Sequence, residues 1–117
     1  MTTPVYAKMA VIGCGLIGSS VIRAARASGA VAEVAVADAS PAARERITAL
    51  GFADSVTADP AEAVRDADLV VFAAPVMAMG EAARAAAPGI KANATVTDVG
   101  SVKAATDAGA AAARRVG

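Results

Sequence analysis

The sequence predicts an α/β fold in which helices cover both faces of a doubly wound parallel sheet. Mostly apolar stretches alternate with stretches of helical periodicity along the 117 residues, and a glycine-rich turn follows the first apolar stretch. Hydrophobic residues make up 56% of the chain but aromatic residues only 3%. Alternating strands and helices need crossover connections, and small aliphatic side chains suit helices packed closely on a sheet.

Each element is predicted from its local pattern. Apolar runs predict strands buried on both faces, and apolar residues at helical spacing predict the helices between them. The predicted strands cover residues 5–13, 31–37, 54–57, 68–74 and 94–99. The predicted helices cover residues 16–28, 41–50, a short segment after residue 59, 77–87, and a last segment from about residue 101. Residues 1–117 are therefore expected to form one domain.

Capping residues mark several helix boundaries. Ser40 and Pro41 fit an N-cap followed by proline at the first helical position. Gly51 stands where a left-handed C-cap belongs. Asp59 and Glu62 match a capping box, in which Glu62 reaches back to the amide of Asp59.

Charge, apolar runs and cysteine content exclude several classes of function. The 11 Lys and Arg residues balance 11 Asp and Glu residues, which disfavours nucleic acid or an anionic membrane as partner. The longest apolar run, residues 69–79, is much shorter than the roughly 20 residues of a membrane span, and residues 1–4 carry no secretory signal. One cysteine and no histidine leave no disulfide or zinc site. We therefore expect a cytoplasmic protein without metal, nucleic-acid or membrane partners.

Gly13, Gly15 and Gly18 form a GxGxxG pattern between the first predicted strand and the first predicted helix. This context is typical of Rossmann-like folds that bind dinucleotides. Gly13 permits a tight turn, Gly15 lets the backbone approach a pyrophosphate, and Gly18 permits close packing of helix on strand. The first amides of the helix, including those of Leu16 and Ile17, are expected to bind the phosphates.

Asp38 ends the second predicted strand, about 20 residues after the last of these glycines. A carboxylate there accepts hydrogen bonds from the adenosine ribose and repels a 2′-phosphate, so NAD is expected and NADP is less favoured. Arg44 and Arg46 lie inside the next helix, where we expect them to be solvated. Two alternatives stay open: Asp38 only caps a turn, or the domain binds S-adenosylmethionine or a regulatory nucleotide.

Two further segments leave the carboxyl ends of strands, where doubly wound sheets bind their ligands. Ala74, Pro75 and Val76 form the exit from the fourth strand and are expected to contact the cofactor, although a proline there can simply end the strand. Ser101 and Lys103 follow the fifth strand and are expected to form an anion site suited to a carboxylate. The alternative is that Ser101 is an N-cap and Lys103 extends into solvent.

The sequence resembles the prephenate/arogenate dehydrogenase family, which makes the precursor of tyrosine. The resemblance rests on residues 11–20 (VIGCGLIGSS), 68–76 (DLVVFAAPV) and, most specifically, 98–103 (DVGSVK). It implies NAD(P)-dependent oxidation of the ring 4-hydroxyl of prephenate or arogenate, with loss of the ring carboxylate as CO₂. It also implies that Ser101 lies near the nicotinamide and the substrate hydroxyl and assists a catalytic histidine, and that the full-length enzyme is a homodimer.

The resemblance covers only the cofactor-binding half of such an enzyme. Oxidation of an alcohol needs a base, but the chain has no histidine, Asp98 ends a buried strand, and Lys103 suits an anion. We therefore expect the chain to bind NAD without turning over substrate alone. Because a doubly wound dinucleotide fold normally has a sixth strand, we also expect an incomplete sequence that lacks the C-terminal helical domain for catalysis and dimerisation.

Two other interpretations remain open. Related β-hydroxyacid-type dehydrogenases and imino-acid reductases have front domains of similar architecture, although residues 100–103 favour the tyrosine pathway. A small non-catalytic NAD-sensing module is also compatible with the short length and the absent histidine.

Overall fold

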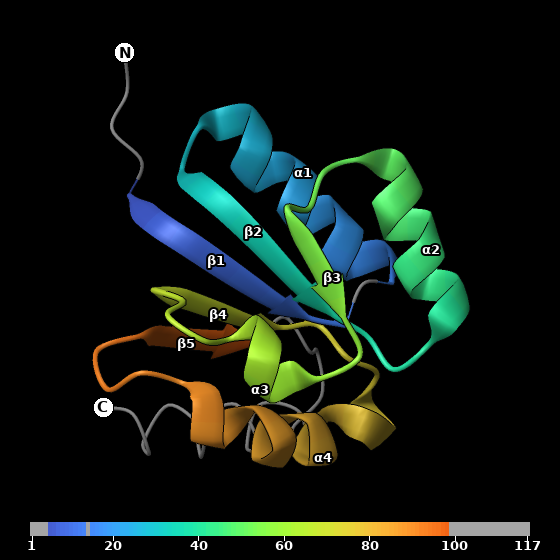
Figure 1. Ribbon diagram of the computed structural model, residues 1–117, viewed down its shortest axis with the longest axis vertical. Helices are drawn as coiled ribbons and strands as arrows, with labels where there is room; N and C mark the ends of the chain where they lie inside the picture. The colour runs from blue at the N-terminus through green and yellow to red at the C-terminus, as the bar shows by residue number, and fades with distance from the viewer. Residues whose placement is uncertain (1–4, 14, 99–117) are drawn as a thin grey trace.

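A computed structural model describes residues 5–13 and 15–98, which form a parallel sheet covered by helices on both faces (Figure 1). Within these residues the strands are β1 (Tyr6–Ile12), β2 (Val31–Ala37), β3 (Ser55–Thr57), β4 (Leu69–Phe72) and β5 (Thr95–Asp98). The helices are α1 (Leu16–Ser28), α2 (Pro41–Leu50), α3 (Pro60–Ala63) and α4 (Val76–Ala86), and a 3₁₀ turn follows at Ala87–Gly89. The predicted α/β fold is confirmed.

The strand order is β3-β2-β1-β4-β5, and every neighbouring pair is parallel. The chain therefore starts in the middle of the sheet, builds outwards to β3, and then returns to the other side of β1. In the register, Val11 lies between Val36 of β2 and Val71 of β4. This reversal between β1 and β4 is the topological switch point, where ligands bind in open α/β sheets.

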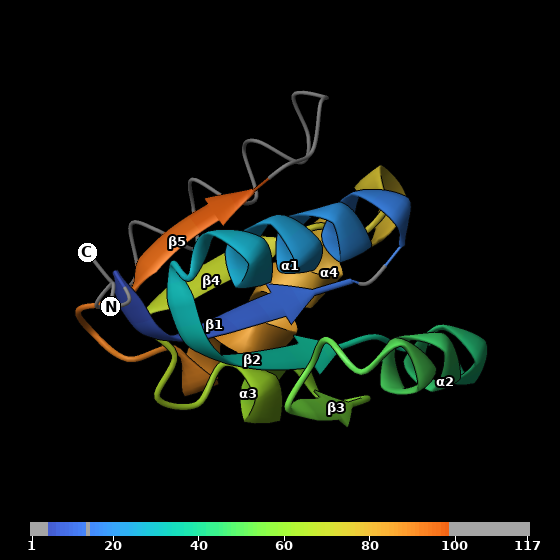
Figure 2. The same ribbon diagram turned by 90° about the horizontal axis from the view of Figure 1, so that it is seen from above.

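Alternate residues of each central strand serve two separate apolar cores. Met9 and Val11 belong to the core beneath α1 and α2, whereas Ala10 and Ile12 belong to the core beneath α3 and α4. Figure 2 shows α1 and α3 on opposite sides of the sheet. Phe72 is fully buried in the second core. Burial on both faces explains why the last four residues of β1 and of β2 are all apolar.

The predicted caps of α2 are confirmed, whereas the capping box at α3 is formed differently. Ser40 Oγ accepts a hydrogen bond from the Ala43 amide, and Gly51 adopts the left-handed conformation with φ +73°. Asp59 caps α3 through the amide of Ala61. The prediction that Glu62 reaches the Asp59 amide is wrong.

The hydroxyl of Thr57, and not the carboxylate of Glu62, accepts the hydrogen bond from the Asp59 amide at the start of α3. Thr57 Oγ1 accepts from the Asp59 amide at 3.1 Å and donates to Glu62 Oε2 at 3.2 Å. The fifth strand forms at Thr95–Asp98, within the predicted range, but the expectation that it is buried is wrong, because Thr95 and Thr97 are exposed and Asp98 is half-buried. The helix expected from about residue 101 lies outside the described residues.

Two carboxylates tie the amino ends of β3 and β4 to the rest of the sheet. The carboxylate of Asp54 accepts a hydrogen bond from the Val34 amide at 2.8 Å and forms an ion pair with Arg26. The hydrogen bond from Val34 is the main reason why the pKa of Asp54 is lowered, although partial burial acts in the opposite direction. The carboxylate of Asp68 forms an ion pair with Lys91 and accepts a hydrogen bond from the Lys8 amide. Both contacts lower the pKa of Asp68, and the contact with Lys91 has the larger effect. Because both pKa values are lowered, both carboxylates stay ionised near neutral pH. They lie at the amino ends of the strands, away from the carboxyl ends where ligands bind in such sheets.

None of the helices in the described part of the chain is long and apolar enough to cross a membrane.

Candidate functional site

The carboxyl ends of β1, β2 and β4 surround a cavity of about 340 Å³. This volume lies at the small end of ligand pockets, which span roughly 300–1,000 Å³. The cavity brings together three segments that the sequence analysis singled out: the glycine turn, the end of β2 and the exit from β4. Its lining residues are Ile12, Gly13, Ala37, Asp38, Ala39, Ala58, Pro60, Ala74, Pro75, Ala78, Glu81, Ala82 and Ala85.

The glycine turn packs tightly against the segment that leaves β4. Gly13 has φ +95°, and a Cβ at this position would lie 2.7 Å from the Ala74 amide nitrogen. A Cβ on Gly18 would lie 2.4 Å from the carbonyl oxygen of Gly13. Real Cβ atoms do not approach backbone atoms so closely, so both positions require glycine. The turn is thereby fixed at the end of β1.

Gly15 differs from its two neighbours in the motif. It is the exposed N-cap of α1 with φ −73°, and apart from its two chain neighbours no described residue has a heavy atom within 4 Å of the position that a Cβ would take. Neither the conformation nor the packing of this structure therefore requires glycine at residue 15. Because glycine has no side chain, a ligand in solvent can approach the backbone at the start of α1 directly.

Within the described residues, no side chain caps the amino terminus of α1, and its first turn contains no acidic residue. Unpaired amides and the positive end of the helix dipole favour an anion at such a terminus. The amides of Leu16 and Ile17 belong to this first turn; their side chains lie outside the described part of the structure, as does Cys14. Together with open access at Gly15, the helix start has the chemistry of a phosphate site.

Asp38 lies half-buried at the end of β2, where hydrogen bonds fix its carboxylate and backbone. Its Oδ1 accepts from the Ser40 amide at 2.8 Å, and its own amide donates to the Thr57 carbonyl at 3.0 Å. The turn-capping role considered from the sequence is therefore present, and the same contact orients the carboxylate at the cavity wall.

The expectation that Arg44 extends into solvent is wrong. It is half-buried, and its Nη1 donates to the carbonyl of Asp38 at 2.8 Å and to that of Ala39 at 3.2 Å. Because Arg44 lies in the first turns of α2, its long side chain reaches back over the turn that precedes the helix. Arg46 is exposed, as predicted. The Asp38 turn thus carries one carboxylate and one guanidinium.

The remaining predicted site residues are placed only in part. Ala74 and Pro75 line the cavity, and Val76 begins α4, with its side chain outside the described residues. Ser101 and Lys103 also lie outside them. In the part that the structure describes, no three His, Cys, Asp or Glu side chains gather closely enough to hold a metal ion.

Sequence reasoning missed the wall that α4 contributes. Its residues in the lining are Ala78, Glu81, Ala82 and Ala85, which share one face of the helix. That spacing was readable from the sequence, but the helix gave no sign that this face would turn to the cavity. Ala58, which follows β3, and Pro60, the first residue of α3, were missed as well.

Sheet order, glycine turn and the acid at the end of β2 define a Rossmann-like nucleotide-binding domain. Residues 21–114 match the family model described as prephenate dehydrogenase, nucleotide-binding domain. The chain belongs to the prephenate dehydrogenase family, and the resemblance stated from the sequence is confirmed.

Individual relatives agree with this assignment. The chain is 46% identical over 99 residues to a cyclohexadienyl dehydrogenase of Zymomonas mobilis. The aligned region covers 85% of this chain and 34% of that protein. The crystal structure of prephenate dehydrogenase from A. aeolicus, in complex with hydroxyphenyl propionate and NAD⁺, superposes with a TM-score of 0.80 and 26% identity over 93% of this chain and 39% of its own. Synechocystis arogenate dehydrogenase shares the fold, with a TM-score of 0.74 and 23% identity over 86% of this chain and 37% of its own. The chain therefore spans about a third of the curated relative.

Proposed function

We propose that residues 1–117 are the NAD-binding domain of a prephenate or arogenate dehydrogenase. The observation that carries this proposal is the uncapped start of α1 at Gly15, open to solvent, next to a cavity that Asp38 lines. Amides at a helix start suit the diphosphate, and a carboxylate at the end of β2 suits the ribose hydroxyls. The related A. aeolicus enzyme was crystallised with NAD⁺, which supports the same cofactor here.

NAD is proposed over NADP because the carboxylate of Asp38 repels a 2′-phosphate. The guanidinium of Arg44 lies against the same turn and acts in the opposite direction, since it attracts a phosphate. The carboxylate prevails, because it lines the cavity whereas Arg44 does not.

Asp38→Asn is expected to reduce the preference for NAD over NADP by roughly tenfold. Asparagine keeps an oxygen that can accept from the Ser40 amide, so the turn is retained while the charge is removed. Arg44→Gln in the Asp38→Asn background is expected to reverse part of the gain in NADP affinity. Calorimetric titration with both dinucleotides measures the ratio.

The matched control is Asp66→Asn, which removes the same charge from an exposed turn residue with φ +61°, a conformation that asparagine tolerates. It should leave the ratio unchanged. An Asp38→Asn ratio equal to that of the wild-type chain would rule out the proposed role of the carboxylate.

The proposed reaction follows from the family resemblance. NAD supplies the acceptor for the hydride that leaves the carbon bearing the ring hydroxyl, and the ring carboxylate departs as CO₂, leaving an aromatic ring. Ser101 would contact the substrate hydroxyl and Lys103 a substrate carboxylate. We further propose that the rest of the enzyme supplies the base, the remaining pocket and a homodimer interface, and that the enzyme acts in tyrosine biosynthesis in the cytoplasm.

The 117-residue chain alone is expected to bind NAD without reducing it. It contains no histidine, and removal of the hydroxyl proton needs a base with a pKa near the working pH. The measurement is the absorbance of NADH after mixing the chain with NAD and either prephenate or arogenate. Substrate-dependent NADH formation at a rate above that of the mixture without protein would disprove this expectation.

A further inference from the structure

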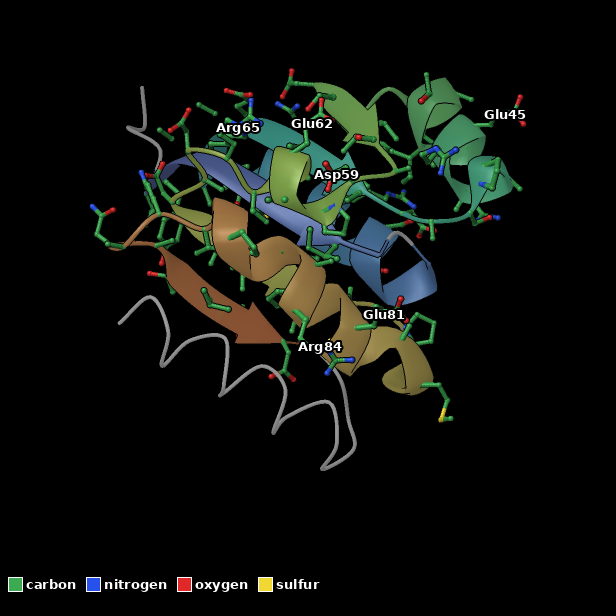
Figure 3. The ribbon with its side chains drawn as sticks, turned by 60° about the horizontal axis from the view of Figure 1, so that its bottom comes forward. Glu45, Asp59, Glu62, Arg65, Glu81 and Arg84 are labelled. Atoms are coloured by element: carbon green, nitrogen blue, oxygen red, sulfur yellow. The ribbon has the colours of Figure 1, made fainter. Side chains whose placement is uncertain are left out.

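Glu81 is an unusual residue in the wall that α4 presents to the cavity. The other α4 residues in the lining, Ala78, Ala82 and Ala85, end at Cβ, whereas Glu81 carries a carboxylate to the rim. No hydrogen bond or ion pair joins Glu81 to another described residue, and its side chain is exposed. Figure 3 shows it on α4, with Arg84 about one turn further along; Arg84 does not line the cavity.

The rest of the cavity is suited to a flat apolar group. Apart from Asp38 and Glu81, every lining residue is alanine, glycine, proline or isoleucine. If Asp38 binds the ribose, the base attached to that ribose must enter this apolar space. Among the lining residues that the structure describes, Glu81 is then the one side chain besides Asp38 that can hydrogen-bond an edge of the base.

The chemistry of a carboxylate selects among purines. An ionised carboxylate only accepts hydrogen bonds. Adenine offers an exocyclic amine at its 6-position, whereas a 6-keto purine offers an oxygen, which is itself an acceptor. A carboxylate facing this position therefore favours the amine and repels the keto oxygen.

We propose that Glu81 is a specificity-determining residue that accepts a hydrogen bond from the 6-amino group of the adenine base. The proposal rests on the proposed function, because it assumes a dinucleotide in the cavity. It goes further in assigning recognition of the base, not only of the ribose and phosphates, to this chain.

The test compares NAD with nicotinamide hypoxanthine dinucleotide, which differs from NAD in having a keto oxygen in place of the amine. Calorimetry on the 117-residue chain should give about tenfold tighter binding of NAD, in line with a hydrogen bond to a charged group. Glu81→Gln should bind both dinucleotides about equally, because an amide both donates and accepts. Glu81→Lys should reverse the preference, since an ammonium only donates.

Glu33→Gln is the matched control, because it removes the same charge from an exposed residue of β2 that does not line the cavity. Its ratio of affinities should equal that of the wild-type chain. A ratio that Glu81→Gln and Glu81→Lys both leave unchanged, with NAD still bound, would overturn this proposal alone. Failure of the wild-type chain to bind NAD would overturn the proposed function as well.

Discussion

Gly15→Ala is expected to weaken NAD binding roughly 10- to 100-fold while the fold stays intact. An alanine methyl at this position meets no atom of the described residues within 4 Å, apart from its chain neighbours, and extends into the space above the start of α1. A diphosphate that contacts the first amides of the helix must occupy that space, and forcing a methyl group into a close contact costs about 1–3 kcal/mol. The φ of −73° is accessible to alanine.

Two measurements separate binding from stability in this variant. Calorimetry should show the loss of NAD affinity, and urea unfolding should show a change of no more than about 1 kcal/mol, the cost of a poorer N-cap. Gly51→Ala should behave in the opposite way, because residue 51 has φ +73°, ends α2 and does not line the cavity. Its unfolding free energy should fall by about 1–2 kcal/mol with NAD affinity unchanged. Tight NAD binding by Gly15→Ala would show that the diphosphate does not lie there.

Gly13→Ala is expected to lower the free energy of unfolding by about 2–5 kcal/mol. Two costs combine: a side chain at φ +95°, and a Cβ that would lie 2.7 Å from the amide nitrogen of Ala74. The atoms that this Cβ would meet belong to the backbone of Ala73 and Ala74, just after β4. Because backbone atoms cannot rotate away as a side chain can, the clash is removed only if the ends of β1 and β4 move apart. A domain of this size has a stability of about 5–15 kcal/mol, so the variant should lose a large part of it.

Gly80→Ala provides the control for this loss. Residue 80 lies inside α4, and outside the backbone of this helix its Cβ would meet, among the described residues, only the Arg84 guanidinium at 3.5 Å, an ordinary contact. Alanine is the better helix former, so stability should rise by about 0.5–1 kcal/mol. Urea unfolding followed by circular dichroism measures both variants. A Gly13→Ala protein as stable as wild type would mean that the turn does not hold the geometry described above.

The fold was predictable because local signals in this chain agree with its tertiary structure. The apolar residues 9–12 of β1 reflect burial on both faces. Ser40, Pro41 and Gly51 mark the ends of α2 without reference to the rest of the chain. The positions of Gly13 and Asp38 at the cavity were predictable for a related reason. Parallel strands bring their carboxyl ends to one edge, so residues that follow different strands meet there.

Other features depend on side-chain reach and on which face of a helix turns inwards. Arg44 returns to the carbonyl of Asp38 through a side chain long enough to span the preceding turn, and the sequence pattern treats it like any helical arginine. Glu62 is separated from the Asp59 amide by the Thr57 hydroxyl, which lies in the strand before the helix. Glu81 reaches the cavity because α4, which starts after the carboxyl end of β4, turns the face that carries Glu81 towards it.

A crystal structure of the 117-residue chain grown with NAD⁺ tests the central claim most directly. The account predicts the diphosphate against the amides at the start of α1 beside Gly15, the adenosine ribose on the carboxylate of Asp38, and the adenine in the cavity along α4. A dinucleotide bound elsewhere, or a cavity filled by the protein's own side chains at saturating NAD⁺, would contradict it.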